Sequence, residues 1–254
     1  MIKILLYGSS GKMGESVINI VKGSADFEIA AGVDSCAPSE PMPFPVFAKI
    51  SDCDVPADII IDFSTAEAVL DAVDYAVLKE VPIIICTTAL TDETICRIDE
   101  AAKTIPVLRS ANMSIGINLL MGLLKKCAVI LNDAGFDIEI VEKHHRRKID
   151  APSGTALMLA DAINEAAGGK FNYVYDRESI REKRGDNDLG IISLRGGTIA
   201  GEHDVIFAGE NEIVELNHRA LSNDVFSQGT LLAVKFLVGK APGTYDMEDI
   251  FNEI

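Results

Sequence analysis

The stretch IKILLYGSSGKMGESVINIV, residues 2 to 21, decides how the first half of the chain folds. Its apolar run IKILLY predicts a buried strand, and the apolar spacing in ESVINIV predicts a helix. Between them, Gly8 suits a tight exit from the strand, Gly11 a close approach of backbone amides to a pyrophosphate, and Gly14 close packing of the helix on the sheet. A phosphate would then lie at the positively polarised start of that helix.

The order of elements after this turn predicts a parallel sheet. The expected strands are residues 2–7, 27–33, 58–62, 82–86 and 105–108, and the expected later helices are 66–80 and 92–103. Continuous apolar strands that alternate with helices are covered on both faces, so the fold class is α/β with a Rossmann-type parallel-sheet domain. Residues 35–50 hold four prolines and are expected to form a surface loop.

This context predicts dinucleotide binding more strongly than the glycine turn does. The spacing GxxGxxG alone indicates only a turn, but Asp34 follows twenty residues after Gly14, at the end of the second strand. Its carboxylate can accept both hydroxyls of an adenosine ribose and would repel a 2′-phosphate, the alternative being a solvated residue at a strand end. Ser35 and Cys36 add no positive charge, and Lys12 is the nearby cation. We therefore expect NADH to be preferred or equal, with NADPH accepted.

The totals of the chain argue against several classes of function. A net charge of −16 and a pI near 4.6 do not provide the basic face that nucleic acid requires. The five cysteines are odd in number and contain no CxxC pair, so neither a zinc site nor a disulfide framework is indicated. The first residues are typical of a strand rather than of a signal peptide or membrane span. We expect a cytoplasmic protein that binds no metal, nucleic acid or membrane.

The second half predicts a different, α+β architecture. The expected elements are a helix from Gly116, a strand at 137–141, a helix from Gly154 to about Ala167, strands at 191–195, 204–209 and 212–218, and a helix at 227–239. Adjoining strands indicate a mixed or antiparallel sheet. We place a dinucleotide-binding domain at 1–114 and 224–254, and a substrate-binding and oligomerisation domain at 115–223.

A second stretch, EKHHRRKIDAPSGTAL at residues 142–157, holds a basic run within an acidic chain. The run includes two of the four histidines and is expected to form a loop between a strand that ends at Glu142 and the helix from Gly154. Ser153 or Asp150 could cap that helix, and Pro152 suits its first turn.

An anion in this loop could meet imidazoles, a lysine and the free amides of Gly154 and Thr155. The alternative is a solvated basic loop before a well-capped helix. Adjacent histidines rarely reach one metal ion together, and the chain has no nucleophile elbow, so metal binding and serine catalysis are poor interpretations.

The same stretch closely resembles the signature E-x-H-H-x-x-K-x-D-x-P-S-G-T-A of the 4-hydroxy-tetrahydrodipicolinate reductase (dihydrodipicolinate reductase) family. The resemblance covers nearly the whole chain: the segments GSSGKMG, CTTALTDE, SANMSIGIN, RGGTIAGEH and YDMEDI are also similar to family segments. It implies reduction of 4-hydroxy-tetrahydrodipicolinate to tetrahydrodipicolinate with NAD(P)H, in the diaminopimelate route to L-lysine. It also implies a homotetramer assembled through the sheet of the second domain.

The resemblance further implies a role for each matched residue. His144 corresponds to a proton donor or acceptor, Lys148 to a second proton donor, and His145, Gly154 and Thr155 to contacts with a substrate carboxylate. The implied cofactor contacts are Gly8, Ser9, Ser10, Gly11, Lys12, Met13, Asp34, Cys86, Thr87, Thr88, Ser110, Ala111, Asn112 and Met113. Cys86 and Ala89 replace the glycines of the family's GTTG loop, and Ser35 replaces a basic residue that some members use for a 2′-phosphate.

The chemistry of the residues suits such a reaction. A cyclic dicarboxylate accounts for a cationic pocket in an acidic protein, and a hydride that arrives at a conjugated imine leaves negative charge that a nearby acid must quench. Two other classes stay open, another nicotinamide-dependent dehydrogenase of similar architecture and a non-catalytic dinucleotide sensor. The first would have no reason for HHRRK joined to PSGT, and the second would not need His144 and Lys148.

Overall fold

The chain forms two compact units in a computed structural model that describes residues 1–36, 38, 41–179 and 181–253. Unit 1 comprises Met1–Ile115 and Asn223–Ile254, and unit 2 comprises Gly116–Ser222. The boundaries expected from the sequence, after residues 114 and 223, each lie one residue away from these.

Unit 1 contains a seven-stranded sheet in the order β12-β6-β5-β4-β1-β2-β3, with all neighbouring strands parallel. Its strands are β1 Ile2–Tyr7, β2 Phe27–Val33, β3 Val46–Phe47, β4 Ile59–Asp62, β5 Ile83–Ile85, β6 Pro106–Arg109 and β12 Gly243–Tyr245. The central strands are almost wholly apolar and buried, as a sheet covered on both faces requires. This confirms the predicted Rossmann-type parallel sheet.

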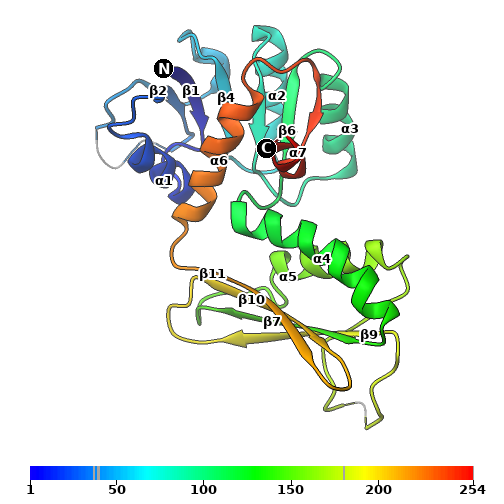
Figure 1. The fold of residues 1–254 in the computed structure, drawn as a ribbon. Helices are drawn as coiled ribbons and strands as arrows, with labels where there is room; N and C mark the ends of the chain where they lie inside the picture. The colour runs from blue at the N-terminus through cyan, green and yellow to red at the C-terminus, as the bar shows by residue number, and fades with distance from the viewer. Residues whose placement is uncertain (37, 39–40, 180, 254) are drawn as a thin grey trace. The chain divides into compact units, whose positions relative to one another are not determined.

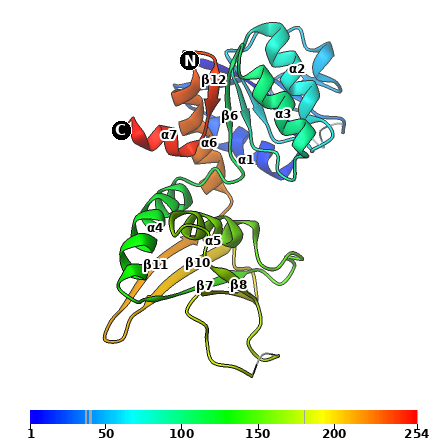
Figure 2. The same cartoon turned by 90° about the vertical axis from the view of Figure 1, so that its right-hand side faces the viewer.

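Helices cover both faces of this sheet (Figures 1 and 2). They are α1 Lys12–Val21, α2 Val69–Lys79, α3 Asp92–Ala101, α6 Asp224–Leu237 and α7 Met247–Asn252. One core joins the sheet to α2 and α3, and a second joins it to α1, α6 and α7. The helix expected from residue 66 begins only at Val69.

The segment expected as a loop at 35–50 is partly ordered. Residues 37, 39 and 40 lie outside the described residues, but β3 pairs with β2 inside this segment. A short 3-10 helix, η1 Ile50–Asp52, follows it.

Unit 2 is a five-stranded sheet with helices on one face (Figure 1). The order β11-β10-β7-β9-β8 is mixed, because β10 runs antiparallel to β7 and β11 whereas β9 runs parallel to β7 and β8. The elements are α4 Ile115–Asp133, β7 Asp137–His144, α5 Gly154–Ala166, β8 Asn172–Val174, β9 Asp188–Arg195, β10 Gly201–Ala208 and β11 Ile213–Ala220. The predicted α+β unit with a mixed sheet is therefore confirmed.

Strict alternation separates the two faces of this sheet. In β7, Ile138 and Ile140 are buried under α4 and α5, and the same phase continues through Glu142 to His144. The expectation that the strand ends at Glu142 and that His144 lies in a loop is therefore wrong. The opposite side, which we call the open face, carries Ile192 and Leu194 of β9, each about half exposed.

Helix α4 is, within the described part of the chain, the one helix long and apolar enough to cross a membrane by length and composition. Its residues Leu120, Leu124 and Ala128 are buried in the core of unit 2 against the sheet and α5. Other apolar residues of the helix, such as Leu119 and Ile130, are exposed.

Candidate active site

The glycine turn of unit 1 needs two of its glycines for its own geometry. Gly8 has φ of +82°, and a Cβ there would lie 2.5 Å from the carbonyl oxygen of Phe63. A Cβ on Gly14 would lie 2.3 Å from the Gly8 carbonyl oxygen. The nearest atom to a Cβ on Gly11 is 3.4 Å away, an ordinary contact, so the backbone at Gly11 is open on that side. That openness suits the approach of a ligand phosphate to the start of α1.

Asp34 follows β2 and reaches back to the glycine turn. One carboxylate oxygen accepts a hydrogen bond from the Ser10 amide at 2.9 Å, and the other accepts one from the Cys36 amide at 2.9 Å. The Ser10 hydroxyl is buried and has no hydrogen-bond partner among the described residues, whereas the equally unpartnered Ser9 hydroxyl points inward against Gly32. An unsatisfied Ser10 hydroxyl beside a helix start fits a site that a ligand completes.

The buried carboxylate of Asp62, which the sequence did not indicate as a site residue, links the loop after β4 to the loop after β5. Asp62, at the end of β4, is fully buried and accepts hydrogen bonds from the Ser64 amide at 3.1 Å, from the Ser64 hydroxyl, and from the Thr87 hydroxyl at 2.7 Å. Burial raises the pKa of Asp62 even though these hydrogen bonds oppose the shift. Asp62 therefore fixes the loop after β5 that carries Cys86 and Thr88.

The two replaced glycines of that loop differ in their setting. Ala89 adopts φ of +57°, a left-handed conformation that glycine occupies without strain. Burial, and secondarily the charge of Asp62, raises the pKa of the Cys86 thiol well above its usual range. Cys86 is therefore a neutral, core-facing side chain.

The segment after β6 is held by its own side chains. The Ser110 hydroxyl donates to the Asn112 carbonyl at 2.9 Å, and the Asn112 side-chain oxygen accepts from the Ser114 amide at 2.9 Å. Met113 is buried in the core, and a Cβ on Gly229 of α6 would lie 1.7 Å from its carbonyl oxygen.

Parallel strands bring their carboxyl ends to one edge of a sheet. The predicted cofactor residues of unit 1 follow β1, β2, β5 and β6 and therefore share that edge. The side chains of Ser9 and Met113 face the protein interior, so at these two positions only the backbone is available.

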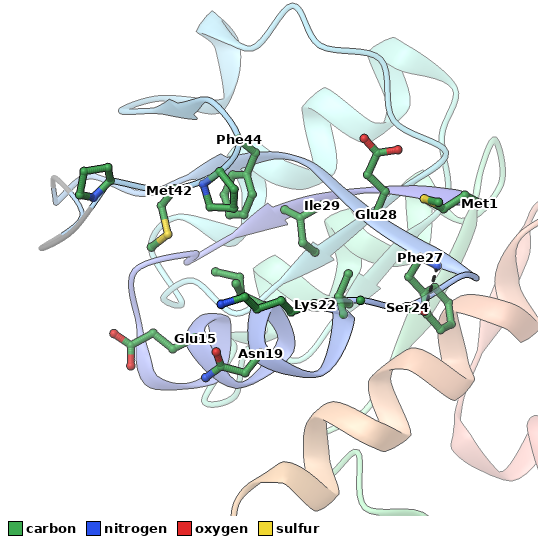
Figure 3. A pocket seen from close by; sticks show the side chains of 15 residues that line it. Met1, Glu15, Asn19, Lys22, Ser24, Phe27, Glu28, Ile29, Met42 and Phe44 are labelled. Carbon is green, nitrogen blue, oxygen red and sulfur yellow. Dashed lines mark hydrogen bonds between the residues drawn. The ribbon is translucent and has the colours of Figure 1, made fainter.

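One groove of unit 1 is formed by a different set of residues. It has a volume of about 660 Å³ and runs along the flank of α1, between Glu15, Asn19 and Lys22 on one side and Met42 and Phe44 on the other (Figure 3). None of the predicted cofactor residues lines it.

The side chains of the basic run in unit 2 point to different parts of the structure. Lys143 points to the open face, where its ammonium contacts Asp204 at 2.7 Å and Glu202 at 3.3 Å. Arg146 and Arg147 are exposed. His144, His145 and Lys148 remain as candidate ligand-binding side chains.

His144 is buried at the end of β7 and contacts a fully buried carboxylate. Its Nδ1 lies 2.6 Å from Oε2 of Glu142. The Arg195 guanidinium donates two further hydrogen bonds of 2.7 Å, one to each oxygen of Glu142. Burial would raise the pKa of Glu142, but hydrogen bonds from Arg195, His144 and Ser193 outweigh it and lower the pKa to about 2. Glu142 is therefore ionised at neutral pH.

A second buried histidine braces the start of α5. His203 Nε2 lies 2.9 Å from the Ser153 hydroxyl, and its ring packs edge-on against His144 with centroids 5.3 Å apart. Burial, followed by the neighbouring His144, lowers the pKa of His203 to about 4, so it is neutral at pH 7. The Ser153 oxygen also accepts from the Ala156 amide at 3.1 Å.

Ser153, rather than Asp150, is therefore the cap of the helix that starts at Gly154. Pro152 lies before this cap, after a cis peptide bond, and not in the first turn as expected. A Cβ on Gly154 would meet no atom within 4 Å, so this side of the helix start is open. Together with the following Thr155 it forms the first turn of α5, where an anion is favoured.

Lys148 and His145 lie in the loop that precedes this helix. The Lys148 ammonium is 2.9 Å from Asp150, and the Lys148 amide donates to the His145 carbonyl at 3.1 Å. His145 Nδ1 is buried and has no partner within the described ranges. In residues 1–36, 38, 41–179 and 181–253, no group of three His, Cys, Asp or Glu side chains is arranged to hold a metal ion.

The parallel sheet with its glycine turn, joined to a unit that presents a buried histidine beside a helix start, defines a two-unit, pyridine-nucleotide-dependent oxidoreductase. A solved dehydrogenase of this architecture, WlbA from Chromobacterium violaceum in complex with NADH and UDP-GlcNAcA, matches with a TM-score of 0.61 at 13% identity, covering 98% of this chain and 89% of that chain. At that identity the likeness concerns the fold alone.

The chain belongs to the dihydrodipicolinate reductase family. Models of the N-terminus and C-terminus of dihydrodipicolinate reductase match residues 2–113 and 116–251. A 4-hydroxy-tetrahydrodipicolinate reductase from Caldanaerobacter subterraneus subsp. tengcongensis is 50% identical over 253 residues, covering 100% of this chain and 99% of the relative. A dihydrodipicolinate reductase from Paenisporosarcina sp. TG-14 with dipicolinate bound matches with a TM-score of 0.85 at 25% identity, covering 98% of this chain and 99% of that one. The predicted family is confirmed.

Sequence reasoning missed Glu142, Arg195 and His203 as site residues. The alternation in DIEIVEKH places Glu142 on the same face as His144 and could have indicated their contact. Arg195 and His203 lie in the family segment RGGTIAGEH, but their approach to His144 depends on strand pairing that the local sequence does not show.

Proposed function

We propose that this chain reduces 4-hydroxy-tetrahydrodipicolinate to tetrahydrodipicolinate with NAD(P)H, a step in the diaminopimelate route to L-lysine. The observation that carries the proposal is the buried pair of Glu142 and His144 next to the open helix start at Gly154. This arrangement offers a proton donor and a site for a carboxylate within one unit, which is what reduction of a cyclic dicarboxylate requires.

The edge of unit 1 fits a nicotinamide dinucleotide. The turn from Gly8 to Met13 would hold the pyrophosphate at the start of α1, and Asp34 would hold the adenosine ribose. The loops at Cys86–Thr88 and Ser110–Met113 would line the nicotinamide end. When bound, the cofactor supplies the hydride.

The residues of unit 2 would hold the substrate and manage protons. Gly154 and Thr155, at the start of α5, bind one carboxylate with assistance from His145. In its doubly protonated form, His144 delivers the proton of Nε2 and keeps the Nδ1 proton that faces Glu142. Lys148, a second donor, stabilises the negative charge that develops as hydride arrives.

A coupled assay tests the activity. The substrate is generated by the upstream synthase, and oxidation of NADH is followed at a fixed ionic strength. We expect His144→Ala and Lys148→Ala each to lower turnover by ~10² to 10⁴-fold, the usual contribution of a general acid. Their dissociation constants for NADH should stay close to that of the wild type, since both residues lie in unit 2. Near-normal turnover in both variants would remove them as proton donors, and no turnover by the wild type would favour another dehydrogenase or a dinucleotide sensor.

The cofactor is proposed to be NADH by preference or on equal terms, with NADPH accepted. Asp34 disfavours a 2′-phosphate, and the exposed Lys12 would offset this by only ~0 to 1 kcal/mol. Dissociation constants for both cofactors, measured on the wild type and Lys12→Ala, decide this point. NADPH binding tenfold tighter than NADH binding in the wild type would overturn it.

We further propose that the chain forms a homotetramer through the open face. Ile192 and Leu194 of β9 and Ile213 at the start of β11 leave apolar surface on or beside this face. Among the described residues of unit 2, no helix covers this side of the sheet. Light scattering should show four copies for the wild type and fewer for Leu194→Glu. The five free cysteines support a reduced, cytoplasmic setting.

A further inference from the structure

The carboxylate of Glu142 is the point where two parts of the site meet. Its Oε2 receives His144 Nδ1 at 2.6 Å and one Arg195 nitrogen at 2.7 Å. Its Oε1 receives the Ser153 amide at 3.0 Å and the second Arg195 nitrogen at 2.7 Å. The side chain is wholly buried, and each oxygen has at least two protein donors.

We propose that Glu142 is a positioning residue that sets the proton donor His144 and the carboxylate-binding start of α5 in one fixed geometry, with Arg195 as the balancing charge. This inference rests on the proposed function where it concerns catalysis. Its geometric part, the joint placement of His144 and Ser153 by one carboxylate, does not.

The contact with His144 selects which ring nitrogen faces the site. An ionised carboxylate only accepts hydrogen bonds, so Nδ1 carries the proton and Nε2 is the nitrogen that exchanges it. A Cβ on Gly201 would lie 3.1 Å from Nε2. Glycine at this position of β10 therefore keeps the working nitrogen uncrowded.

The contact with Ser153 fixes the helix start. The Ser153 amide is bound to Oε1, and the Ser153 hydroxyl caps Ala156 and contacts His203. The position of the backbone at Gly154, which follows Ser153 directly, is therefore fixed relative to His144. A shift of about 1 Å in such a pair can lower a rate by about 100-fold, so a shared anchor has a direct kinetic consequence.

Arg195 neutralises part of the buried negative charge of Glu142. A lone buried carboxylate would repel a dicarboxylate and would hold the proton of His144 too firmly. The groups that act on His144 are Glu142 on β7, Arg195 on β9, Lys148 in the following loop and His203 on β10. Burial lowers the pKa of His144, Glu142 raises it, and Lys148 and Arg195 lower it further.

Opposite substitutions in this pair should move His144 in opposite directions. Glu142→Gln removes the carboxylate and should lower the pKa of His144, whereas Arg195→Met leaves the carboxylate less neutralised and should raise it. Charges at this distance change a pKa by about 1 to 3 units. The measurement is an NMR titration of the His144 ring in the full chain, with the resonance assigned through His144→Gln. Glu165→Gln, an exposed glutamate on α5, is the matched control and should leave the titration unchanged.

Kinetics and ligand binding supply the second readout. Glu142→Gln should lower kcat by about 100-fold and should weaken pyridine-2,6-dicarboxylate binding, because the amide group of Gln places donors against the Ser153 amide or Arg195. If Glu142→Gln does not fold, Glu142→Asp takes its place. It keeps the charge but shortens the side chain, so the contact with Nδ1 is lost and both the pKa of His144 and kcat should fall.

Shifts of the same sign in both variants, or no shift in a folded variant, would overturn the inference. If the pKa of His144 shifts in opposite directions in the two variants but the wild type does not reduce the substrate, the positioning role is upheld and the proposed function is rejected.

Discussion

Ser153→Ala removes one buried hydroxyl that serves two partners in unit 2. The Ser153 oxygen accepts from the Ala156 amide at 3.1 Å and lies 2.9 Å from His203 Nε2. Loss of a helix cap typically costs ~1 kcal/mol. The substitution also leaves a buried ring nitrogen unpaired, which costs ~1 to 3 kcal/mol. We therefore expect unit 2 to lose about 2 to 4 kcal/mol of stability at neutral pH, where His203 is uncharged.

A second capping residue provides the control. Thr91 caps α3 in unit 1 by accepting from the Thr94 amide at 3.2 Å, and its hydroxyl lies 2.9 Å from the Thr94 hydroxyl rather than beside a buried histidine. Thr91→Ala should therefore cost only ~1 kcal/mol. The difference between the two variants isolates the contribution of His203.

Hydrogen exchange followed by mass spectrometry is the suitable assay, because two units need not unfold in one transition. Opening free energies are read from peptides of α5 for Ser153→Ala and of α3 for Thr91→Ala, each against the wild type. Equal losses in the two variants would show that the contact with His203 does not stabilise unit 2, and the reasoning on the buried histidine would be refuted.

Three further outcomes follow from the structure. Gly154→Ala should fold normally, because its Cβ meets no atom within 4 Å. It should weaken the binding of pyridine-2,6-dicarboxylate in a calorimetric titration by at least about tenfold, or about 1.4 kcal/mol. Unchanged affinity would place the ligand elsewhere. Asp62→Asn should loosen the loop that Thr87 anchors and raise the dissociation constant for NADH, whereas Asp52→Asn, an exposed aspartate, should not. The pKa of Glu142 is lowered from 4.5 to about 2. Its ionised form therefore adds up to about 3 kcal/mol to the free energy of unfolding above pH 4.5, and this stabilisation is lost as the pH falls through 2. The acid unfolding of Glu142→Gln should lack this pH dependence.

The sequence predicted those parts of the fold that local pattern determines. Runs such as IIID and III are buried on both faces of a parallel sheet and can be recognised without knowing their neighbours. Strands β3 and β12 have two and three residues, and they exist because an adjacent strand offers hydrogen bonds, so their own residues gave no signal. The start of α2 was placed too early because the helical pattern continues through residues 66–68, which form a turn.

The candidate site likewise combines residues that local sequence indicates with contacts that depend on strand pairing. His144, Lys148 and Gly154 stand in one sixteen-residue segment that the family resemblance identifies. The partnership of Glu142 with Arg195 joins residues 53 positions apart, and it arises because β7 pairs in parallel with β9 so that Glu142 lies opposite Ser193 and His144 opposite Arg195. No local pattern carries that register. The contact between His203 and Ser153 likewise depends on the pairing of β10 with β7.

The division of unit 1 into two separated segments has a consequence for synthesis of the protein. Unit 2 is continuous from Gly116 to Ser222, and its last strand leaves the ribosome before α6 begins at Asp224. The sheet of unit 1 gains its edge strand only at Gly243–Tyr245, which pairs with β6, made more than a hundred residues earlier. Since domains fold as units during translation, the enclosed unit can reach its native state while the enclosing one still lacks the helix that covers one of its faces. A chain released after residue 240 should therefore contain a folded unit 2 and a sheet of unit 1 that is still open at its edge.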